Sequence, residues 1–204
     1  MSITVAPVGN SRILSVGTYR PKRVVPNSEI VDRIDSTDEW IVQRTGIESR
    51  RFAGDDETVI SMAKAACEIA LKRAKLTIAD IDTVILSTIS YPFQAPSAAT
   101  ELINELGNPK AAAFDISAAC AGFCYGVAMG SDLVRSGTSK NVLVIGVEKL
   151  SDYTDPDDRA TAFIFADGAG AVIIGQSDQP RIGQTIWGSD ADSRDAIMLT
   201  PSSS

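Results

Sequence analysis

Histidine is absent from this chain of 204 residues. The imidazole ring is the commonest general base in enzymes and a common metal ligand, so chemistry within these residues must use other side chains. Positive charge is also scarce, with 19 Lys and Arg against 26 Asp and Glu and a net charge of −7. Phosphate backbones are bound by concentrated positive charge, and the densest group is only Arg20-Pro21-Lys22-Arg23. We therefore expect no nucleic-acid partner.

Cysteine is sparse, and long apolar runs are missing. Three cysteines, Cys67, Cys120 and Cys124, are an odd number without the density of a disulfide scaffold, which favours free thiols and a cytoplasmic location. The first twelve residues lack the apolar core of a secretory signal. The most apolar stretch, residues 111–130, is interrupted by Asp115, so we expect no membrane span. Two cysteines one turn apart do not complete a tetrahedral site, so we expect no metal.

Helical and strand patterns alternate along the chain. Helices are expected over residues 28–34, from 38 to a stop at Gly46, and over 57–76, 97–106 and 120–136. Strands are expected over 13–19, 83–88, 112–116 and 142–148, with a further apolar stretch at 163–175 and a new strand at 181–187. Cys67 falls on the apolar face of the 57–76 helix and is expected in the core. Central strands that are continuously apolar indicate a sheet covered on both faces, in an α/β layered architecture.

The segment Asp167-Gly168-Ala169-Gly170 has two interpretations. It loosely resembles a phosphate-binding loop, yet no GK[ST] or GxGxxG pattern follows a strand and opens a helix. Close backbone packing is the favoured interpretation.

Cys120 stands where the expected strand 112–116 turns through small residues into a helix. Unpaired backbone N–H groups and the helix dipole at that place favour thiolate over thiol, and a thiolate can act as a nucleophile. A small buried packing residue is the alternative. Cys124, one turn later, is expected to be a packing residue, and a weak redox pair with Cys120 stays open.

Three segments together resemble β-ketoacyl-[acyl-carrier-protein] synthase III, the enzyme that starts bacterial type II fatty-acid synthesis. The resemblance extends over the chain from about residue 12 onward. The segments are Asp38-Glu39-Trp40-Ile41 with Arg44-Thr45-Gly46-Ile47, Ala118-Ala119-Cys120-Ala121-Gly122-Phe123, and Asp155-Pro156-Asp157-Asp158-Arg159 running into Phe165-Ala166-Asp167-Gly168-Ala169-Gly170-Ala171.

The resemblance implies a thiolase-like layered fold, αβαβα when complete, of which this chain supplies the N-terminal half. Residues 1–178 would form that half, and residues 179–204 would begin the C-terminal half. A homodimer is implied, and the apolar strand 142–148 is a candidate to continue the sheet across its interface.

The same resemblance implies the chemistry and the site residues. Cys120 would accept an acetyl or short acyl group from acyl-CoA, and malonyl-acyl carrier protein would then condense with it as carbon dioxide leaves. No cofactor is implied, because the coenzyme A thioester is a substrate. Trp40, Arg44 and Arg159 match positions at the coenzyme A entrance, although singly they also fit a core tryptophan and solvated ion pairs. Ala95 matches the position that closes the acyl pocket.

The family's catalytic His and Asn have no counterpart in a sequence without histidine. We therefore expect the chain alone to be inactive in condensation, and its missing half to be a separate or cleaved chain. Two rival functions stay open. One is a polyketide or quinolone starter synthase of the same fold, which the acyl-CoA that labels Cys120 would distinguish. The other is a non-catalytic half that only pairs with a partner subunit.

Overall fold

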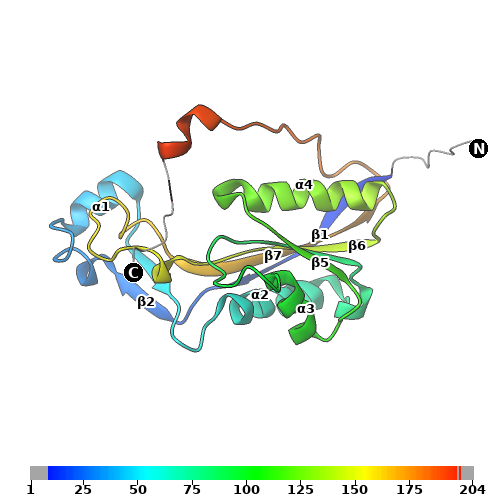
Figure 1. The fold of residues 1–204 in the computed structure, drawn as a ribbon, viewed down its shortest axis with the longest axis horizontal. Helices are drawn as coiled ribbons and strands as arrows, with labels where there is room; N and C mark the ends of the chain where they lie inside the picture. Colours follow the sequence, from blue (N-terminus) through cyan, green and yellow to red (C-terminus); the bar gives the residue numbers. More distant parts are fainter. Residues whose placement is uncertain (1–8, 197, 199–204) are drawn as a thin grey trace, which may run out of the picture.

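A five-stranded mixed sheet forms the centre of the computed structural model, which describes residues 9–196 and Met198 (Figure 1). The strands are β1 (Asn10–Tyr19), β4 (Thr83–Ser87), β5 (Ala112–Ile116), β6 (Asn141–Lys149) and β7 (Asp167–Ser177). Their order is β1-β7-β6-β4-β5, with β6, β4 and β5 parallel and β7 antiparallel to both of its neighbours. Because β6 is paired on both sides, the expectation that it continues the sheet across an interface is wrong; the edge strands are β1 and β5.

Helices cover both faces of this sheet. The helices α2 (Val59–Ala74) and α3 (Ala98–Leu106) lie on one face, and α4 (Gly122–Arg135) lies on the other (Figure 1). Along β6, Leu143 and Ile145 belong to the cluster packed on α2 and α3, whereas Val142 and Val144 belong to the cluster packed on α4. Alternate residues of one strand are thus buried on opposite faces, which explains why the central strands are continuously apolar. The expected α/β layered fold is confirmed.

The helix limits follow the capping residues. Thr58 caps α2 through a reciprocal pair of hydrogen bonds with Ser61, and Ser97 caps α3. The helix α1 (Asp38–Thr45) begins after Thr37 and ends at Gly46, whose left-handed φ of 72° suits glycine. Three of the short helical turns, η2 (Ile78–Asp80), η4 (Leu150–Asp152) and η5 (Ala191–Ala196), connect or follow these elements.

A smaller unit, which we call the cap, packs at one end of the sheet. It contains β2 (Arg23–Pro26) paired with β3 (Ser49–Phe52), the turn η1 (Asn27–Glu29), α1 and part of the segment 153–166. The expected helix over 28–34 is wrong beyond the single turn η1. The reason is that the Asn27 side chain does not cap a helix: it donates to Asp38 Oδ1 at 2.6 Å and to the Ile47 carbonyl at 2.8 Å.

The segment after β7 crosses the outer side of α4 (Figure 1). The ring of Trp187 packs against Tyr125 at a centroid distance of 4.8 Å, and the Tyr125 hydroxyl donates to the Gly188 carbonyl. The strand expected at 181–187 is wrong, because the described part of this segment pairs with no strand. The predicted boundary between the two halves at residue 178 stays a prediction. Residues 197 and 199–204 of the predicted second half lie outside the described residues.

No helix in the described part of the chain is long and apolar enough to cross a membrane.

Candidate active site

Cys120 lies in the short turn η3 (Ala119–Ala121), between the end of β5 and the first residue of α4. Its predicted place at the start of a helix is confirmed, and its thiol is free and exposed. The turn is sharp: Ala119 has a left-handed φ of 43°, and a Cβ added at Gly122 would lie 1.9 Å from Ser87 Oγ. Only glycine lets α4 begin this close to β4, and that approach holds Cys120 at the carboxyl ends of the parallel strands.

A hollow of about 450 Å³ opens beside Cys120. Cys120 lines it together with residues from the ends of β4 and β6 and from the stretch that enters β7. Those residues are Ser87, Ala119, Phe123, Gly146, Val147, Glu148, Leu150, Ile164, Phe165, Ala166, Asp167, Gly168, Ala169 and Gly170. Cys120 is therefore an exposed thiol in a depression and not a buried packing residue. Cys124 is also exposed, so its expected packing role is wrong, whereas Cys67 is fully buried as predicted.

The glycine-containing segment 167–170 is the beginning of β7, paired with both β1 and β6. The backbone of this segment is therefore paired within the sheet and does not form a phosphate-binding loop. Close packing holds at Gly168, where an added Cβ would lie 3.2 Å from the Tyr19 carbonyl oxygen. At Gly170 an added Cβ would meet no atom within 4 Å.

The structure brings Trp40, Arg44 and Arg159 together in the cap. The Arg44 guanidinium carbon lies 4.6 Å from the centroid of the Trp40 ring, and that of Arg159 lies 5.9 Å from it. Phe163 supports the same indole in an edge-on contact at 5.4 Å. Trp40 thus packs against the cap core on one edge and meets two cations. Arg159 also pairs with Asp35 at 3.3 Å on the surface.

Residues 163–165 connect this aromatic and cationic group to the cysteine. Phe163 contacts Trp40, and the next two residues, Ile164 and Phe165, line the hollow of Cys120. The chain thus runs directly from the contact with Trp40 to the edge of the hollow.

Ala95 lies apart from this group. It is exposed on the segment between β4 and α3, outside the residues that line the hollow. Its expected place at the end of an acyl pocket stays a prediction.

Two carboxylates of the hollow were not singled out from the sequence. Asp167 accepts from the Ala53 amide at 2.7 Å, and from the Ser151 amide at 2.9 Å and the Ser151 hydroxyl at 2.6 Å. It thereby ties β7 to the cap. Burial raises the pKa of the Glu148 carboxyl, against hydrogen bonds that favour its charged form. No spacing rule could have found either carboxylate, because their hydrogen-bond partners are distant in sequence.

No metal-binding group of three or more His, Cys, Asp or Glu occurs within the described residues.

Comparison with known proteins identifies relatives. A sequence model of the 3-oxoacyl-[acyl-carrier-protein] synthase III family matches residues 114–191. The β-ketoacyl-[acyl-carrier-protein] synthase III 1 of Streptomyces avermitilis is 54% identical over 93% of this chain and 54% of that protein. The mycobacterial enzyme of Mycobacterium tuberculosis is 51% identical over 91% of this chain and 55% of its own. The chain thus spans about half the length of the curated relatives it matches.

Solved structures agree with the sequences. The priming β-ketosynthase of the R1128 polyketide pathway superposes with a TM-score of 0.92 at 44% identity, covering 95% of this chain and 58% of that one. The 3-oxoacyl-[acyl-carrier-protein] synthase III of Aquifex aeolicus gives 0.81 at 42% identity, over 83% and 55%. Sequence and fold therefore place this chain in the β-ketoacyl-[acyl-carrier-protein] synthase III family, with its thiolase-like fold, over about half the length of those relatives.

Proposed function

We propose that this chain supplies the acyl-accepting half of a starter condensing enzyme, with Cys120 as the nucleophile. The Cys120 thiolate attacks the carbonyl carbon of an acyl-CoA thioester, and the coenzyme A sulfur leaves and takes up a proton. The acyl group then rests on Cys120 as a new thioester of similar energy, so it stays activated for carbon–carbon bond formation. The observation that supports this most directly is the exposed thiol in a hollow at the carboxyl ends of β4 and β6.

The coenzyme A portion is proposed to lie along the cap. Its adenine would stack on Trp40 between the guanidinium groups of Arg44 and Arg159, which also attract its phosphates. The pantetheine arm would pass residues 163–165 toward Cys120. The contacts among these side chains support that route.

The second step is proposed to use malonyl-acyl carrier protein. Loss of carbon dioxide leaves a carbanion that attacks the acyl-Cys120 carbonyl, and the cysteine departs as thiolate. The negative charge that develops on the extender needs hydrogen-bond donors, and removal of one such donor typically lowers rates by about a hundred- to a thousandfold. In the family these donors include a His, which the 204 residues lack. We therefore propose that these residues alone take up the acyl group but do not condense it.

The acyl-CoA that serves as primer distinguishes a fatty-acid starter synthase from a polyketide starter synthase of the same fold. A relative named β-ketoacyl-[acyl-carrier-protein] synthase III is 54% identical, and a priming β-ketosynthase of a polyketide pathway is 44% identical with a TM-score of 0.92. We propose an acetyl or other short acyl group, in a homodimer and without a bound cofactor. A preference for an unusual starter acyl-CoA would favour the polyketide function, and no labelling at all would favour the non-catalytic pairing half.

The test is acyl transfer to the full chain that carries this sequence. After incubation with acetyl-CoA, intact-mass spectrometry should show one acetyl group, and peptide mapping should place it on Cys120. Cys120→Ala should abolish the label, and Cys124→Ala, an exposed cysteine one turn later, should retain it. Labelling that survives Cys120→Ala would show that another residue is the nucleophile.

A further inference from the structure

Four connections of the chain join the cap to the sheet. The chain enters the cap between β1 and β2, at residues 20–22, and leaves it between β3 and α2, at residues 53–58. It enters the cap again after η4 and returns to the sheet where residue 166 meets β7. We call these four connections the neck. The last two of them also line the Cys120 hollow, so the neck lies directly beside the thiol.

Asp167, the first residue of β7, binds two other connections of the neck. One of its oxygens accepts from the Ala53 amide at 2.7 Å and from the Ser151 hydroxyl at 2.6 Å, and the other accepts from the Ser151 amide at 2.9 Å. Asp167 is only 7% exposed, so these donors replace the water that a carboxylate otherwise needs. Three of the four connections therefore meet at one carboxylate.

Glu57, in the second connection, binds the first one. Its Oε1 accepts from the Tyr19 hydroxyl at 2.6 Å and the Lys22 amide at 3.2 Å, and its Oε2 accepts from the Gly54 amide at 2.9 Å. Lys149, the last residue of β6, adds a bond from its Nζ to the Gly54 carbonyl at 3.3 Å. Hydrogen bonds to a charged group are stronger than those between neutral groups. Two buried carboxylates thus join all four connections.

The neck decides how the cap faces the thiol. The group formed by Trp40, Arg44 and Arg159 lies in the cap, whereas Cys120 lies at the end of the sheet, before α4. A ligand that contacts both must extend past the neck. A displacement of about 1 Å between reacting groups can lower a rate by about a hundredfold. The position of the cap relative to the sheet therefore matters for any such ligand.

We propose that Asp167 and Glu57 are positioning residues that hold the neck fixed and align the cap with Cys120, so that an acyl donor carrying a nucleotide is bound at both ends. The alignment of the donor rests on the proposed function; the fixation of the neck does not. Both carboxylates act through the backbone that they bind. Binding energy from the nucleotide end of a donor assists the reaction at the thiol only when the two ends are held in register.

The experiment compares Asp167→Asn and Glu57→Gln in the full chain that carries this sequence. Each replacement keeps the shape of the side chain and removes its charge. Asp167 lines the Cys120 hollow, whereas Glu57 lies outside the residues that line it. An effect shared by the two variants therefore comes from the neck and not from a contact inside the hollow.

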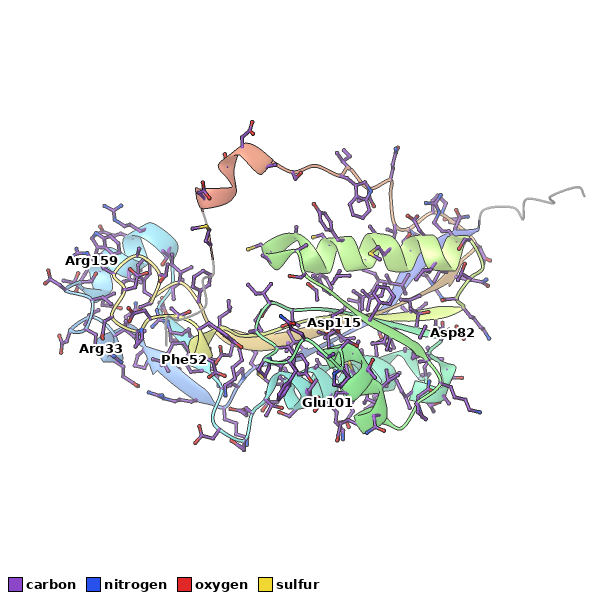
Figure 2. The ribbon with its side chains drawn as sticks, in the orientation of Figure 1. Arg33, Phe52, Asp82, Glu101, Asp115 and Arg159 are labelled. Atoms are coloured by element: carbon purple, nitrogen blue, oxygen red, sulfur yellow. The ribbon has the colours of Figure 1, made fainter. Side chains whose placement is uncertain are left out.

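Asp82→Asn is the matched control. One oxygen of Asp82 accepts from the amides of Lys140 at 2.7 Å and Asn141 at 2.9 Å. Asn141 begins β6, so these bonds lie at the opposite end of that strand from the neck. Figure 2 shows Asp82 far from Phe52, the residue that ends β3 at the neck.

The first measurement is hydrogen–deuterium exchange on peptides that cover residues 53–57 and 149–153. Asp167→Asn should raise exchange in both peptides by about tenfold, and Glu57→Gln should do so in the first, because bonds from amides to a charged group are lost. Asp82→Asn should leave both peptides unchanged and raise exchange at residues 140–141.

The second measurement is acyl transfer to Cys120 from acetyl-CoA and from S-acetyl-N-acetylcysteamine, a short thioester without a nucleotide. The ratio of the first rate to the second should fall about tenfold in both neck variants and stay unchanged in Asp82→Asn. A general loss of stability lowers both rates together, so the ratio reports the alignment. If Asp167→Asn does not fold, Ser151→Ala removes only the hydroxyl donor to Asp167 and gives the same comparison.

Unchanged exchange in the neck variants, or an equal rise in those peptides in Asp82→Asn, would overturn the fixation of the neck. Raised exchange with an unchanged ratio, or a lower ratio in Asp167→Asn alone, would overturn the alignment of the donor. If the unmodified chain takes no acyl group from either thioester, the proposed function fails and the alignment fails with it. The exchange measurement still decides whether the two carboxylates fix the neck.

Discussion

Arg50 on β3 is the central tie of the cap, and Arg50→Met tests how the cap is held together. Arg50 is only 6% exposed. Its Nη1 donates to the Val25 carbonyl at 3.2 Å, and its Nη2 donates to Asn27 Oδ1 at 2.6 Å and to the Phe163 carbonyl at 3.1 Å. One side chain thus joins β2, the turn η1 and the residue that supports Trp40. Methionine fills similar space without a donor.

The magnitude follows from the bonds that are lost. Three acceptors lose a donor, and an unsatisfied buried polar group costs about 1–3 kcal/mol. Opposing this, burial lowers the pKa of Arg50, because the charged guanidinium is held away from water, and the substitution removes that cost. Carbonyl oxygens also relax toward other donors. We therefore expect a net loss of roughly 2–4 kcal/mol in the free energy of unfolding.

Urea unfolding of the full chain measures this loss, and Arg51→Met is the matched control. Arg51 neighbours Arg50 on the same strand, is more exposed, and donates to the carbonyls of Pro21 and Lys22 at 3.1 Å. The control should change the free energy of unfolding by less than about 1 kcal/mol. Equal losses in the two variants, or an unchanged midpoint in Arg50→Met, would refute the assignment of Arg50 as the tie of the cap.

Two further predictions concern thiol access and pH. Alkylation of the native chain should modify Cys120 and Cys124 but not Cys67, because burial raises the pKa of the Cys67 thiol; rapid native modification of Cys67 would contradict its buried position. The Tyr19 hydroxyl donates to Glu57 Oε1 at 2.6 Å and lowers the pKa of that carboxyl. The Glu57 carboxylate therefore stabilises the fold at pH values above its unfolded pKa of about 4.3. This contribution is lost as the pH falls through the lower pKa of the folded state. Tyr19→Phe should flatten the acid-side fall in unfolding free energy, as denaturant titrations at several pH values would measure, and an unchanged slope would count against it.

Helix-stop residues and apolar runs in the sequence predicted those helices and strands that depend on residues close together in the chain. The helices α1 and α3 end at glycines that the sequence identifies, and the central strands appear where the continuous apolar runs are. The position of Cys120 at the turn from strand to helix could also be predicted, since small residues and a following helix are visible in the sequence.

The two strands of the cap escaped prediction for a physical reason. The strands β2 and β3 have four residues each, and what holds them is the buried Arg50 together with Asn27, whose partners are up to 113 residues away in the chain. Side chains with such distant partners leave no periodic signal. An Asn just before the helix expected over 28–34 could either cap it or make tertiary hydrogen bonds with the same side-chain amide, and only the fold decides between the two.

The sequence by itself determined the layered α/β order, the buried Cys67 and the place of Cys120 at the turn from strand to helix, because each depends on neighbours in the chain. Only the tertiary structure decided how Trp40 meets Arg44 and Arg159, how Glu148 accepts from the Ile89 amide, and how Asp115 accepts from the first turn of α3. Those contacts join strands and loops that are distant in sequence, and hydrogen bonds and packing across such distances are set when the sheet assembles.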